Sequence, residues 1–391
     1  MALWITYPIC LLFVFPFAFI RKKNKSHLFF FFDRYSIGGA QRVHLDILES
    51  VSNISKQVFF TRKSHDNKLK DQFYSLTNTE SLDIHIWCDY LFLRLFSVHY
   101  YAFYLNRHTP ATILSANSTF FYDMLPFLSN KLFRIELLHN FSYGKNGMEF
   151  FGFANYKHLE KRMVIDRFTK ENIEKQYHEF QIPPSYNNKV EVVEFGVKIP
   201  DQVSKEFDLP LKVLYAGRGG IQKRVWLINR IAQYFSSSNT NVQFHFAGPA
   251  IVEVNEDVKS KSVIHGEISD RNKMNDIYRY CHVLLLTSAY EGFPMVIKES
   301  MAYGCIPVVT ALPGNLTHLS HLKNALLIRE IEDEEEVVKE AIMNIKILIN
   351  DSQLIARLSR HAYEYAKENF RKESFIQRYR ELLSTPQNTK G

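Results

Sequence analysis

The sequence predicts two α/β domains, each built on a doubly wound parallel sheet. The chain has 391 residues, which is too long for one ordinary hydrophobic core. Short apolar runs alternate with amphipathic stretches, a pattern typical of parallel strands joined by helices. The alternation stops at residues 196–210, where two prolines and mixed charge interrupt it, and then resumes. We therefore interpret residues 196–210 as a linker between the domains.

The first domain is expected over residues 26–195. Its first strand is the apolar run LFFFF at 28–32, which enters the Gly38-Gly39 turn and is followed by a helical apolar stripe. Further strands are predicted at 57–61, 111–116, 133–138, 162–166 and 189–195, with the clearest helices at 90–106 and 170–180.

The second domain is expected over residues 211–370, and residues 371–391 are expected to form a helix and a polar tail. Strands are predicted at 212–218, 242–248, 262–267, 282–288 and 305–310, with helices from 225 to 235, near 271–280, after residue 293, and at about 333–349 and 351–369. The run at 282–288 is short and apolar, as buried parallel strands are.

The composition is that of a globular protein with a basic surface. Hydrophobic residues make up 46% and charged residues 23%, which argues against a disordered chain. The net charge of +7 favours anionic partners such as phosphates or a lipid surface. Nucleic acid is not an expected partner, because no binding motif accompanies the charge. The four cysteines lie far apart, which indicates reduced structural thiols and no zinc site.

The amino terminus is an apolar segment. Residues 2–20 carry no charge and are followed by a basic cluster at 21–25. This length can cross a bilayer, and the basic residues behind it would keep the rest of the chain in the cytoplasm. We interpret residues 1–25 as a membrane anchor, with the protein on the cytoplasmic side of the membrane. An interfacial or buried segment remains the alternative, because Pro8 and Pro16 interrupt a straight helix.

Two carboxylates follow the strand predicted at 282–288. Glu291 lies in the loop after this strand, and Glu299 lies in the helix that comes next. Pro294 is expected at the first helical position, and Gly304 ends the helix. The strand at 305–310 completes a βαβ unit, so Glu291 falls at the carboxyl end of a parallel strand, where open α/β sheets bind ligands.

The residue types of this turn suit an activated sugar. Glu299 can accept the two hydroxyl groups of a ribose, and Glu291 can hold sugar hydroxyls. The backbone N–H groups of Phe293, Met295 and Val296 open the helix and can face an anion or sugar oxygens.

A glycine-rich loop with two cations follows the first strand of the second domain. Arg218 and Lys223 in GRGGIQK are expected at the same sheet edge as Glu291. A diphosphate needs positive charge and backbone N–H groups that it can approach closely, which Gly219 and Gly220 allow. The loop therefore predicts a diphosphate site.

These motifs resemble those of the retaining GT-B glycosyltransferases of family 4 (glycosyl transferases group 1). The matching elements are a strand that ends in G-R-x4-K, a later strand that ends in Gly, and then the motif E-G-F-P-x4-E-x-M-A-x-G. They occur in the order of the family, and the resemblance extends over about residues 28 to 370. It implies two Rossmann-like domains that face each other across a cleft.

The resemblance also implies roles for particular residues. Arg218 and Lys223 would hold the diphosphate of the donor, with Gly38 and Gly39 approaching it from the first domain. Glu299 would bind the nucleotide ribose, and Glu291 would contact the donor sugar. His139, which follows a predicted strand, matches a histidine that lies near the reacting sugar in many members. Two departures are Arg224, where many members have glycine, and Phe195 in place of asparagine before Gly196-Val197.

The implied activity is transfer of a hexose-type sugar from a nucleotide-diphosphate donor to a saccharide or lipid-linked acceptor, with retention. The pathway would be surface polysaccharide or glycolipid biosynthesis. No metal or other cofactor is expected, because Arg218 and Lys223 would stabilise the leaving diphosphate. Two alternatives stay open: an inactive donor-binding scaffold subunit of a polysaccharide assembly complex, and a GT-B sugar-nucleotide epimerase. A dinucleotide oxidoreductase is disfavoured, because Gly38-Gly39 lacks the G-x-G-x-x-G pattern.

Overall fold

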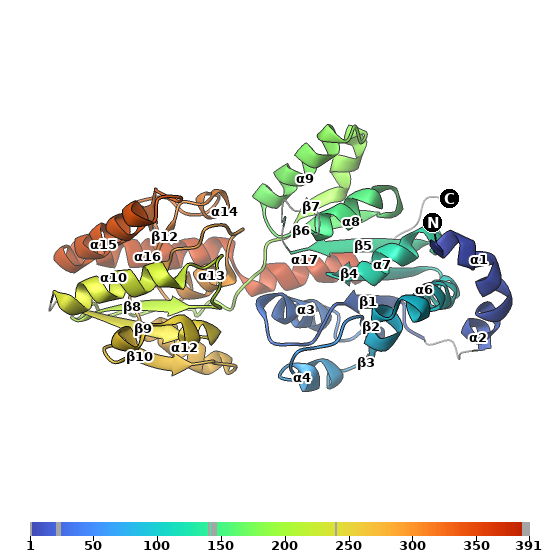
Figure 1. Cartoon of the computed structure of the whole chain (residues 1–391), viewed down its shortest axis with the longest axis horizontal. Helices are drawn as coiled ribbons and strands as arrows, with labels where there is room; N and C mark the ends of the chain where they lie inside the picture. Colours follow the sequence, from blue (N-terminus) through green and yellow to red (C-terminus); the bar gives the residue numbers. More distant parts are fainter. Residues whose placement is uncertain (1, 21–24, 140, 142–146, 239–240, 385–391) are drawn as a thin grey trace. The chain divides into compact units, whose positions relative to one another are not determined.

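The chain folds into two compact units (Figure 1). The computed structural model describes all residues except 1, 21–24, 140, 142–146, 239–240 and 385–391. Unit 1 comprises Met1–Glu194 and Phe375–Gly391, and unit 2 comprises Phe195–Ser374. The helix α17 (Lys372–Ser384) therefore begins in unit 2 and ends in unit 1, where Arg380 Nε donates a hydrogen bond of 3.2 Å to the Ser50 carbonyl.

Unit 1 contains a seven-stranded parallel sheet with the order β3-β2-β1-β4-β5-β6-β7. Its strands are β1 (Leu28–Phe32), β2 (Lys56–Phe60), β3 (Thr79–Asp83), β4 (Ala111–Ala116), β5 (Leu132–Leu138), β6 (Lys161–Val164) and β7 (Val190–Val192). Every residue of β1 is buried, as expected for a central parallel strand covered on both faces. The order reverses between β1 and β4, and this switch point is where open α/β sheets bind ligands.

The helices of unit 1 connect these strands and cover the sheet. They are α3 (Gly39–Ser50), α4 (Lys70–Tyr74), α5 (His85–Asp89), α6 (Leu91–Asn106), α7 (Thr119–Met124), α8 (Met148–Ala154) and α9 (Arg167–Glu179), with short 3₁₀ turns at Leu125–Phe127, Tyr156–His158 and Pro184–Lys189.

The apolar amino-terminal segment forms two short helices, α1 (Ala2–Phe13) and α2 (Phe15–Ile20), separated at Val14. Both pack against α6, where Cys10 and Ala18 form a small buried cluster with Phe103. Among the residues that the structure describes, no helix combines the length and apolar character needed to cross a bilayer. Residues 1 and 21–24 of the predicted anchor lie outside the described residues.

Unit 2 contains a six-stranded parallel sheet with the order β10-β9-β8-β11-β12-β13. Its strands are β8 (Leu211–Ala216), β9 (Val242–Ala247), β10 (Val263–Gly266), β11 (Val283–Leu286), β12 (Ile306–Thr310) and β13 (Leu326–Ile328). The order reverses between β8 and β11, so the loops after these two strands flank the switch point. The prediction of two doubly wound parallel sheets is confirmed.

The helices of unit 2 are α10 (Val225–Ser237), α11 (Glu256–Lys259), α12 (Arg271–Tyr280), α13 (Met295–Met301), α14 (Pro313–Leu316), α15 (Glu334–Asn350) and α16 (Ser352–Asn369), with a 3₁₀ turn at Pro249–Glu253. Residues 196–210, predicted as a linker, contain neither helix nor strand and belong to unit 2.

Four local predictions were incomplete or wrong. The edge strand β3 (Thr79–Asp83) was not predicted, because its sequence TESLD is polar and only partly buried. The three-residue strand β13 was too short to stand out, and the last strand of unit 1 covers only Val190–Val192 of the predicted 189–195. Pro294 caps α13 in an extended conformation instead of occupying its first turn, which agrees with its ψ of 136°.

Candidate functional site

Two loops meet at the switch point of unit 2. The loop after β8 covers residues 217–224, and the loop after β11 covers residues 287–294. The Ala289 N–H donates to the Gln222 carbonyl at 2.8 Å, and Gln222 Nε2 donates to the Tyr290 carbonyl at 2.9 Å. These hydrogen bonds hold the glycine-rich loop against the loop that carries Glu291.

An ion pair between Lys223 and Glu291 joins the same two loops. Each side chain is only 12% exposed, so both charges are largely removed from water. The hydroxyl of Ser288 donates a further hydrogen bond of 3.2 Å to Glu291 Oε1. Since a desolvated charge is costly without a partner, each of the two residues depends on the other.

Arg224 anchors the end of the glycine-rich loop. Its backbone has φ 49° and ψ 52°, the left-handed conformation that glycine adopts without strain. Its buried guanidinium donates to the carbonyls of Thr287 at 2.7 Å, Ile331 at 2.6 Å and Ser288 at 3.2 Å. An arginine is thus accommodated where the family resemblance expects glycine, because three hydrogen bonds offset the backbone strain. Arg224 is therefore a structural residue that fixes Lys223 beside the end of β11.

Arg218 lies at the exposed start of the same loop. Its carbonyl accepts a hydrogen bond of 2.6 Å from the hydroxyl of Tyr215. The pKa of Tyr215 is raised, chiefly by burial and then by the negative charges of Glu253 and Glu291, while Arg218 opposes the shift. Arg218, Glu253 and Glu291 are thus each within electrostatic range of the Tyr215 phenol.

The carboxylate of Glu253 lies against Gly219 and Gly220, which together form the glycine cradle of the loop. Its Oε1 accepts a hydrogen bond of 2.7 Å from the Gly220 N–H. A Cβ at Gly219 would lie 1.9 Å from the same oxygen, so a side chain there would force the Glu253 carboxylate to move. Gly220 has a φ of 100°, which a residue with a side chain rarely adopts. The cradle therefore accepts an anion, and in this structure the anion is a carboxylate of the protein itself.

The loop after β11 leads directly into α13. The Phe293 side chain is buried against His318, with ring centroids 4.4 Å apart, so it has a structural role. A Cβ at Gly314 would lie 2.3 Å from the Gly292 carbonyl oxygen, so the loop is tightly supported from behind. Met295 and Val296 are the first two residues of α13, and the first N–H groups of a helix have no acceptor within it.

Glu299 lies within α13, as predicted, and is positioned by residues of α12. Its Oε2 accepts a hydrogen bond of 2.9 Å from the buried Tyr278 hydroxyl, and its Oε1 lies 3.9 Å from Arg271 Nη2. Within the described part of unit 2, no hydrogen bond or ion pair joins Glu299 to Arg218, Lys223 or Glu291. Glu299 thus forms a second polar group, separate from the Lys223–Glu291 pair.

Gly38 and Gly39 lie at the start of α3, the helix that follows β1. Gly38 is the residue before α3 and has an extended backbone, and Gly39 is the exposed first residue of that helix. Among the described residues, no atom lies within 4 Å of the position that a Cβ at Gly39 would take, so the space beside it is open to them. The turn follows β1 and therefore lies at the switch point of the unit 1 sheet.

His139 follows β5 and is paired with a second histidine. Its Nε2 lies 2.9 Å from Nε2 of His44 on α3, and the His44 ring stacks on Phe32 at 4.1 Å. Burial lowers the pKa of His139 to about 4. Burial, followed by the proximity of His139, lowers the pKa of His44 well below its usual value. Both rings are therefore neutral at pH 7, and one must donate while the other accepts.

The structure thus groups the predicted residues within each unit. In unit 2 it joins Lys223 to Glu291 and brings Arg218 near them, while Glu299 contacts other partners. The sequence did not point to Glu253, Tyr278, Arg271 or His44, because each reaches its partner from a separate part of the chain. Among the described residues, no group of three or more His, Cys, Asp or Glu side chains is arranged to hold a metal ion.

Residues 210–346 match the family model described as glycosyl transferases group 1. This region contains the glycine-rich loop, the loop after β11 and Glu299. No curated protein matches the chain.

Solved structures resemble the chain over most of its length. TarM is 18% identical with a TM-score of 0.59, and the match covers 75% of this chain but only 58% of TarM. Alr3699/HepE from Anabaena, solved in complex with UDP, is 15% identical with a TM-score of 0.68, covering 91% of this chain and 99% of HepE. A glycosyltransferase from Rickettsia africae ESF-5 is 12% identical with a TM-score of 0.69, covering 94% of this chain and 100% of that one.

At these identities, structural likeness establishes the fold. The chain has the two-domain GT-B fold, in which each domain is Rossmann-like. Its second unit carries the part that matches glycosyl transferases group 1.

We expect Lys223→Met to lower the free energy of unfolding of unit 2 by about 1–3 kcal/mol, because Glu291 would be left desolvated without its cation. Urea unfolding can be followed by the fluorescence of Trp226 in a Trp4→Phe, Trp87→Phe background. Trp226 is then the sole tryptophan of the three in the chain and reports on unit 2.

The matched control is Lys259→Met. Lys259 contacts Glu256 at 2.6 Å, but Glu256 is 87% exposed. Its removal should change the free energy of unfolding by less than about 0.5 kcal/mol. Equal losses for the two variants would contradict a special role for the Lys223–Glu291 pair.

The histidine pair predicts a pH dependence for unit 1. Both pKa values are lowered by folding, so between about pH 6.5 and 4 the unfolded chain binds protons that the folded state does not. The free energy of unfolding should fall as the pH falls through this window, by about 1.4 kcal/mol per pH unit for each group.

Replacing His44 by Phe keeps an aromatic ring on Phe32 and removes one titrating group, so the slope of unfolding free energy against pH should decrease in this window. Urea unfolding at a series of pH values measures it, and the slopes of the two proteins should agree above about pH 7.5, where both rings are neutral. An unchanged slope between about pH 6.5 and 4 would contradict the buried neutral pair.

Proposed function

We propose that the protein is a retaining glycosyltransferase that moves a hexose-type sugar from a nucleotide-diphosphate donor to a saccharide or lipid-linked acceptor. The observation that carries the proposal is the Lys223–Glu291 ion pair, which joins two motif loops at the switch point of unit 2. The match of residues 210–346 to glycosyl transferases group 1 supports the class of activity. The UDP complex of HepE supports a nucleotide-linked donor.

The diphosphate of the donor would bind at the glycine-rich loop. The Gly220 N–H already holds a carboxylate oxygen at 2.7 Å, and a phosphate oxygen could take the same hydrogen bond once Glu253 turns away. Arg218 and Lys223 would supply positive charge. A cation about 4 Å from a phosphate gains roughly 4 kcal/mol at an effective dielectric constant of about 20, enough to stabilise a leaving diphosphate.

Binding of the diphosphate would also change the partner of Lys223. The incoming phosphate competes with Glu291 for the ammonium group, because both are anions within reach of the same cation. Glu291, held by Ser288, would then be available to accept hydrogen bonds from hydroxyl groups of the donor sugar. An ion pair within the chain thus becomes two separate contacts with the donor.

Glu299 would bind the ribose of the donor. The Tyr278 hydroxyl fixes one carboxylate oxygen at 2.9 Å and orients the group. A carboxylate can accept hydrogen bonds from two neighbouring hydroxyl groups. Tyr278 is therefore proposed as a positioning residue for this contact.

The proposed reaction breaks the bond between the anomeric carbon and the diphosphate oxygen and forms the bond to the acceptor oxygen on the same face. The acceptor hydroxyl proton passes to the departing phosphate. The residues of the chain position the donor and stabilise the charge that develops on the diphosphate, with Arg218 and Lys223 in the place of a metal ion. A neutral His139 is suited to hydrogen bonding with the donor sugar.

The amino-terminal helices are proposed to attach the protein to the cytoplasmic face of a membrane. Leu12, Phe13 and Ile20 are 73%, 67% and 78% exposed, although they are large and apolar. Exposed apolar residues of this kind mark interaction surfaces. This location would bring the enzyme to lipid-linked acceptors of surface polysaccharide or glycolipid synthesis.

Binding and turnover of the donor test the proposed activity. We expect one of UDP-, GDP- and ADP-sugars to stabilise the protein in a thermal-shift screen, by about 2.7 kcal/mol at about 100 times its dissociation constant. Lys223→Ala should weaken donor binding and abolish slow donor hydrolysis. Glu253→Gln should strengthen binding of the same donor, because it removes a competing negative charge from the glycine cradle. Lys259→Ala serves as the control and should change neither quantity.

Donor binding without any hydrolysis or transfer, across a range of saccharide and lipid-linked acceptors, would contradict an active transferase and favour the scaffold alternative. If Lys223→Ala and Glu253→Gln both bound the donor with the affinity of the wild type, the proposed position of the diphosphate would be contradicted.

Deletion of residues 1–25 tests the membrane proposal. The truncated protein should bind vesicles of anionic phospholipid at least about tenfold more weakly than the full chain, because it lacks the exposed apolar side chains of α1 and α2. Sedimentation with vesicles measures the difference, and donor binding by unit 2 should be unchanged. Equal sedimentation of the two proteins would contradict attachment through this segment.

A further inference from the structure

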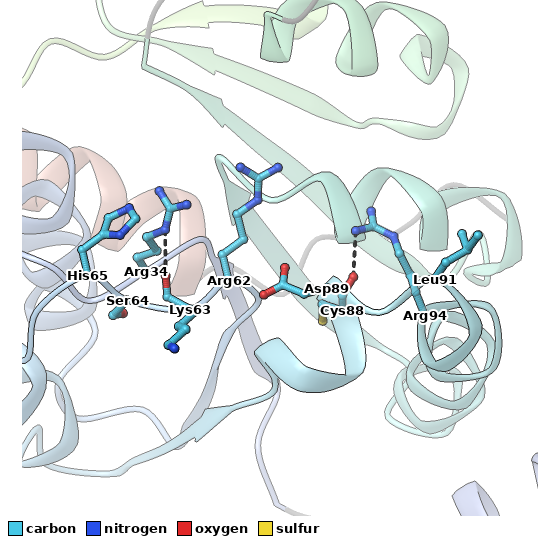
Figure 2. Close-up of a pocket in the computed structure, with 9 residues that line it drawn as sticks. All are labelled: Arg34, Arg62, Lys63, Ser64, His65, Cys88, Asp89, Leu91 and Arg94. Carbon is cyan, nitrogen blue, oxygen red and sulfur yellow. Dashed lines mark hydrogen bonds between the residues drawn. The ribbon is translucent and has the colours of Figure 1, made fainter.

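A basic pocket lies in unit 1 beside the ends of β1 and β2, and nothing in the proposed function uses it (Figure 2). Its volume is about 730 Å³. The residues that line it are Arg34, Arg62, Lys63, Ser64, His65, Cys88, Asp89, Leu91 and Arg94. Arg34 follows β1, residues 62–65 follow β2, and the others come from α5 and α6. The pocket is therefore at the same edge of the sheet as the Gly38-Gly39 turn.

The lining carries an excess of positive charge. Arg34, Arg62, Lys63 and Arg94 are cations, and Asp89 is the sole carboxylate among the lining residues. Arg94 is already committed, because its guanidinium pairs with Asp123 at 2.7 Å and donates to the Cys88 carbonyl at 3.1 Å. The guanidinium of Arg94 therefore has a fixed position in the lining of the pocket.

The other cations are available to a ligand. Arg34 Nε donates to the Lys63 carbonyl at 3.0 Å, which holds the loops after β1 and β2 together. Among the described residues, no carboxylate lies within ion-pair distance of Arg34, Arg62 or Lys63. Asp33 is a nearby negative charge for Arg34 and Arg62. Burial raises the pKa of Asp33, and the positive charges of Arg34 and Arg62 oppose this rise. Two guanidinium groups on neighbouring loops thus line the pocket, with one shared carboxylate behind them.

Guanidinium groups bind phosphate and carboxylate through paired hydrogen bonds. Ser64 adds a hydroxyl group, whose Oγ accepts a hydrogen bond of 3.0 Å from the Tyr35 N–H. Three uncommitted cations and a hydroxyl exceed what one carboxylate needs and suit a phosphate that carries up to two negative charges. A phosphate alone would fill only a small part of about 730 Å³, so the pocket has room for a ligand that extends beyond its phosphate.

The rim of the pocket is apolar and exposed. Leu91 lines the pocket and is 69% exposed. Trp87, Tyr90 and Phe92 are next to the lining residues Cys88, Asp89 and Leu91 in the chain, and they are 52%, 64% and 78% exposed. Exposed apolar side chains that adjoin the residues of a basic pocket in this way favour a ligand with an apolar part next to its charged part.

We propose that this pocket binds the phosphate group of an amphiphilic acceptor, a phosphate ester whose apolar chain lies on the rim formed by Trp87, Tyr90, Leu91 and Phe92. Arg34 and Arg62 hold the phosphate oxygens, assisted by Lys63 and Ser64. The binding of such an ester follows from the pocket itself, and its role as sugar acceptor rests on the proposed function.

Direct binding to the full chain tests the proposal without any need for turnover. The probes are farnesyl phosphate below its micellar concentration, farnesol and inorganic phosphate. The fluorescence of Trp87 in a Trp4→Phe, Trp226→Phe background reports on the rim. We expect farnesyl phosphate to bind at least tenfold more tightly than either farnesol or inorganic phosphate, and to change the fluorescence of Trp87.

The double variant Arg34→Gln, Arg62→Gln should weaken farnesyl phosphate binding at least tenfold. The control Arg357→Gln makes the same kind of charge change at an exposed position of α16 in unit 2 and should leave binding unchanged. A normal thermal transition and unchanged nucleotide binding by the double variant would show that it remains folded.

Three results would overturn the proposal. Farnesol binding as tightly as farnesyl phosphate would remove the role of the phosphate, and inorganic phosphate binding as tightly would remove the role of the apolar chain. Equal affinity of the wild type and the double variant for farnesyl phosphate would place the site elsewhere. Farnesyl phosphate binding that depends on both arginines, in a protein that neither binds nor turns over any nucleotide sugar, would leave this site standing while the proposed function fails.

Discussion

The ion pair between Lys223 and Glu291 is the contact on which the arrangement of unit 2 at its switch point depends. Both side chains are 12% exposed, and each belongs to a loop that has no regular structure of its own. Removing two charges from water costs free energy, which their attraction and the hydrogen bond from Ser288 offset. Because the same two loops are also joined through Gln222, the ion pair is held in place by the backbone and not by the side chains alone.

Glu253 completes a balance of charge at the glycine-rich loop. It supplies a carboxylate to the Gly220 N–H, just as Glu291 supplies one to Lys223. Two of the groups proposed to bind a diphosphate, the Gly220 N–H and Lys223, therefore already have anionic partners in the chain. A diphosphate would exchange partners with them instead of filling unsatisfied groups. This arrangement lowers the cost of keeping a strongly anion-binding loop without ligand, and it reduces net affinity by the energy of the contacts that must break.

The fold could be predicted from the sequence because buried parallel strands are short apolar runs, and LFFFF and VLLL are runs of this kind. The polar edge strand β3 lacks this signal. Within the site, the loops could be located because they follow such strands, but their contacts could not. Gly220 and Glu253 are 33 residues apart, and His44 and His139 are 95 residues apart. Such pairs come together only when the chain packs, and one sequence by itself does not reveal which distant residues will be in contact.

Along the ligand-binding edge of unit 1, charged polar groups lie at one end and uncharged polar groups lie at the other. On the side of β2, the basic pocket brings together Arg34, Arg62 and Lys63. On the side of β5, burial keeps the His44 and His139 rings neutral, so this pair adds no charge to that end of the edge. A ligand with a charged phosphate and an uncharged sugar would therefore be oriented by this edge, because its phosphate gains most near β1 and β2 while its hydroxyl groups lose least near β5. Orientation of this kind follows from the placement of charge and requires no change in the fold.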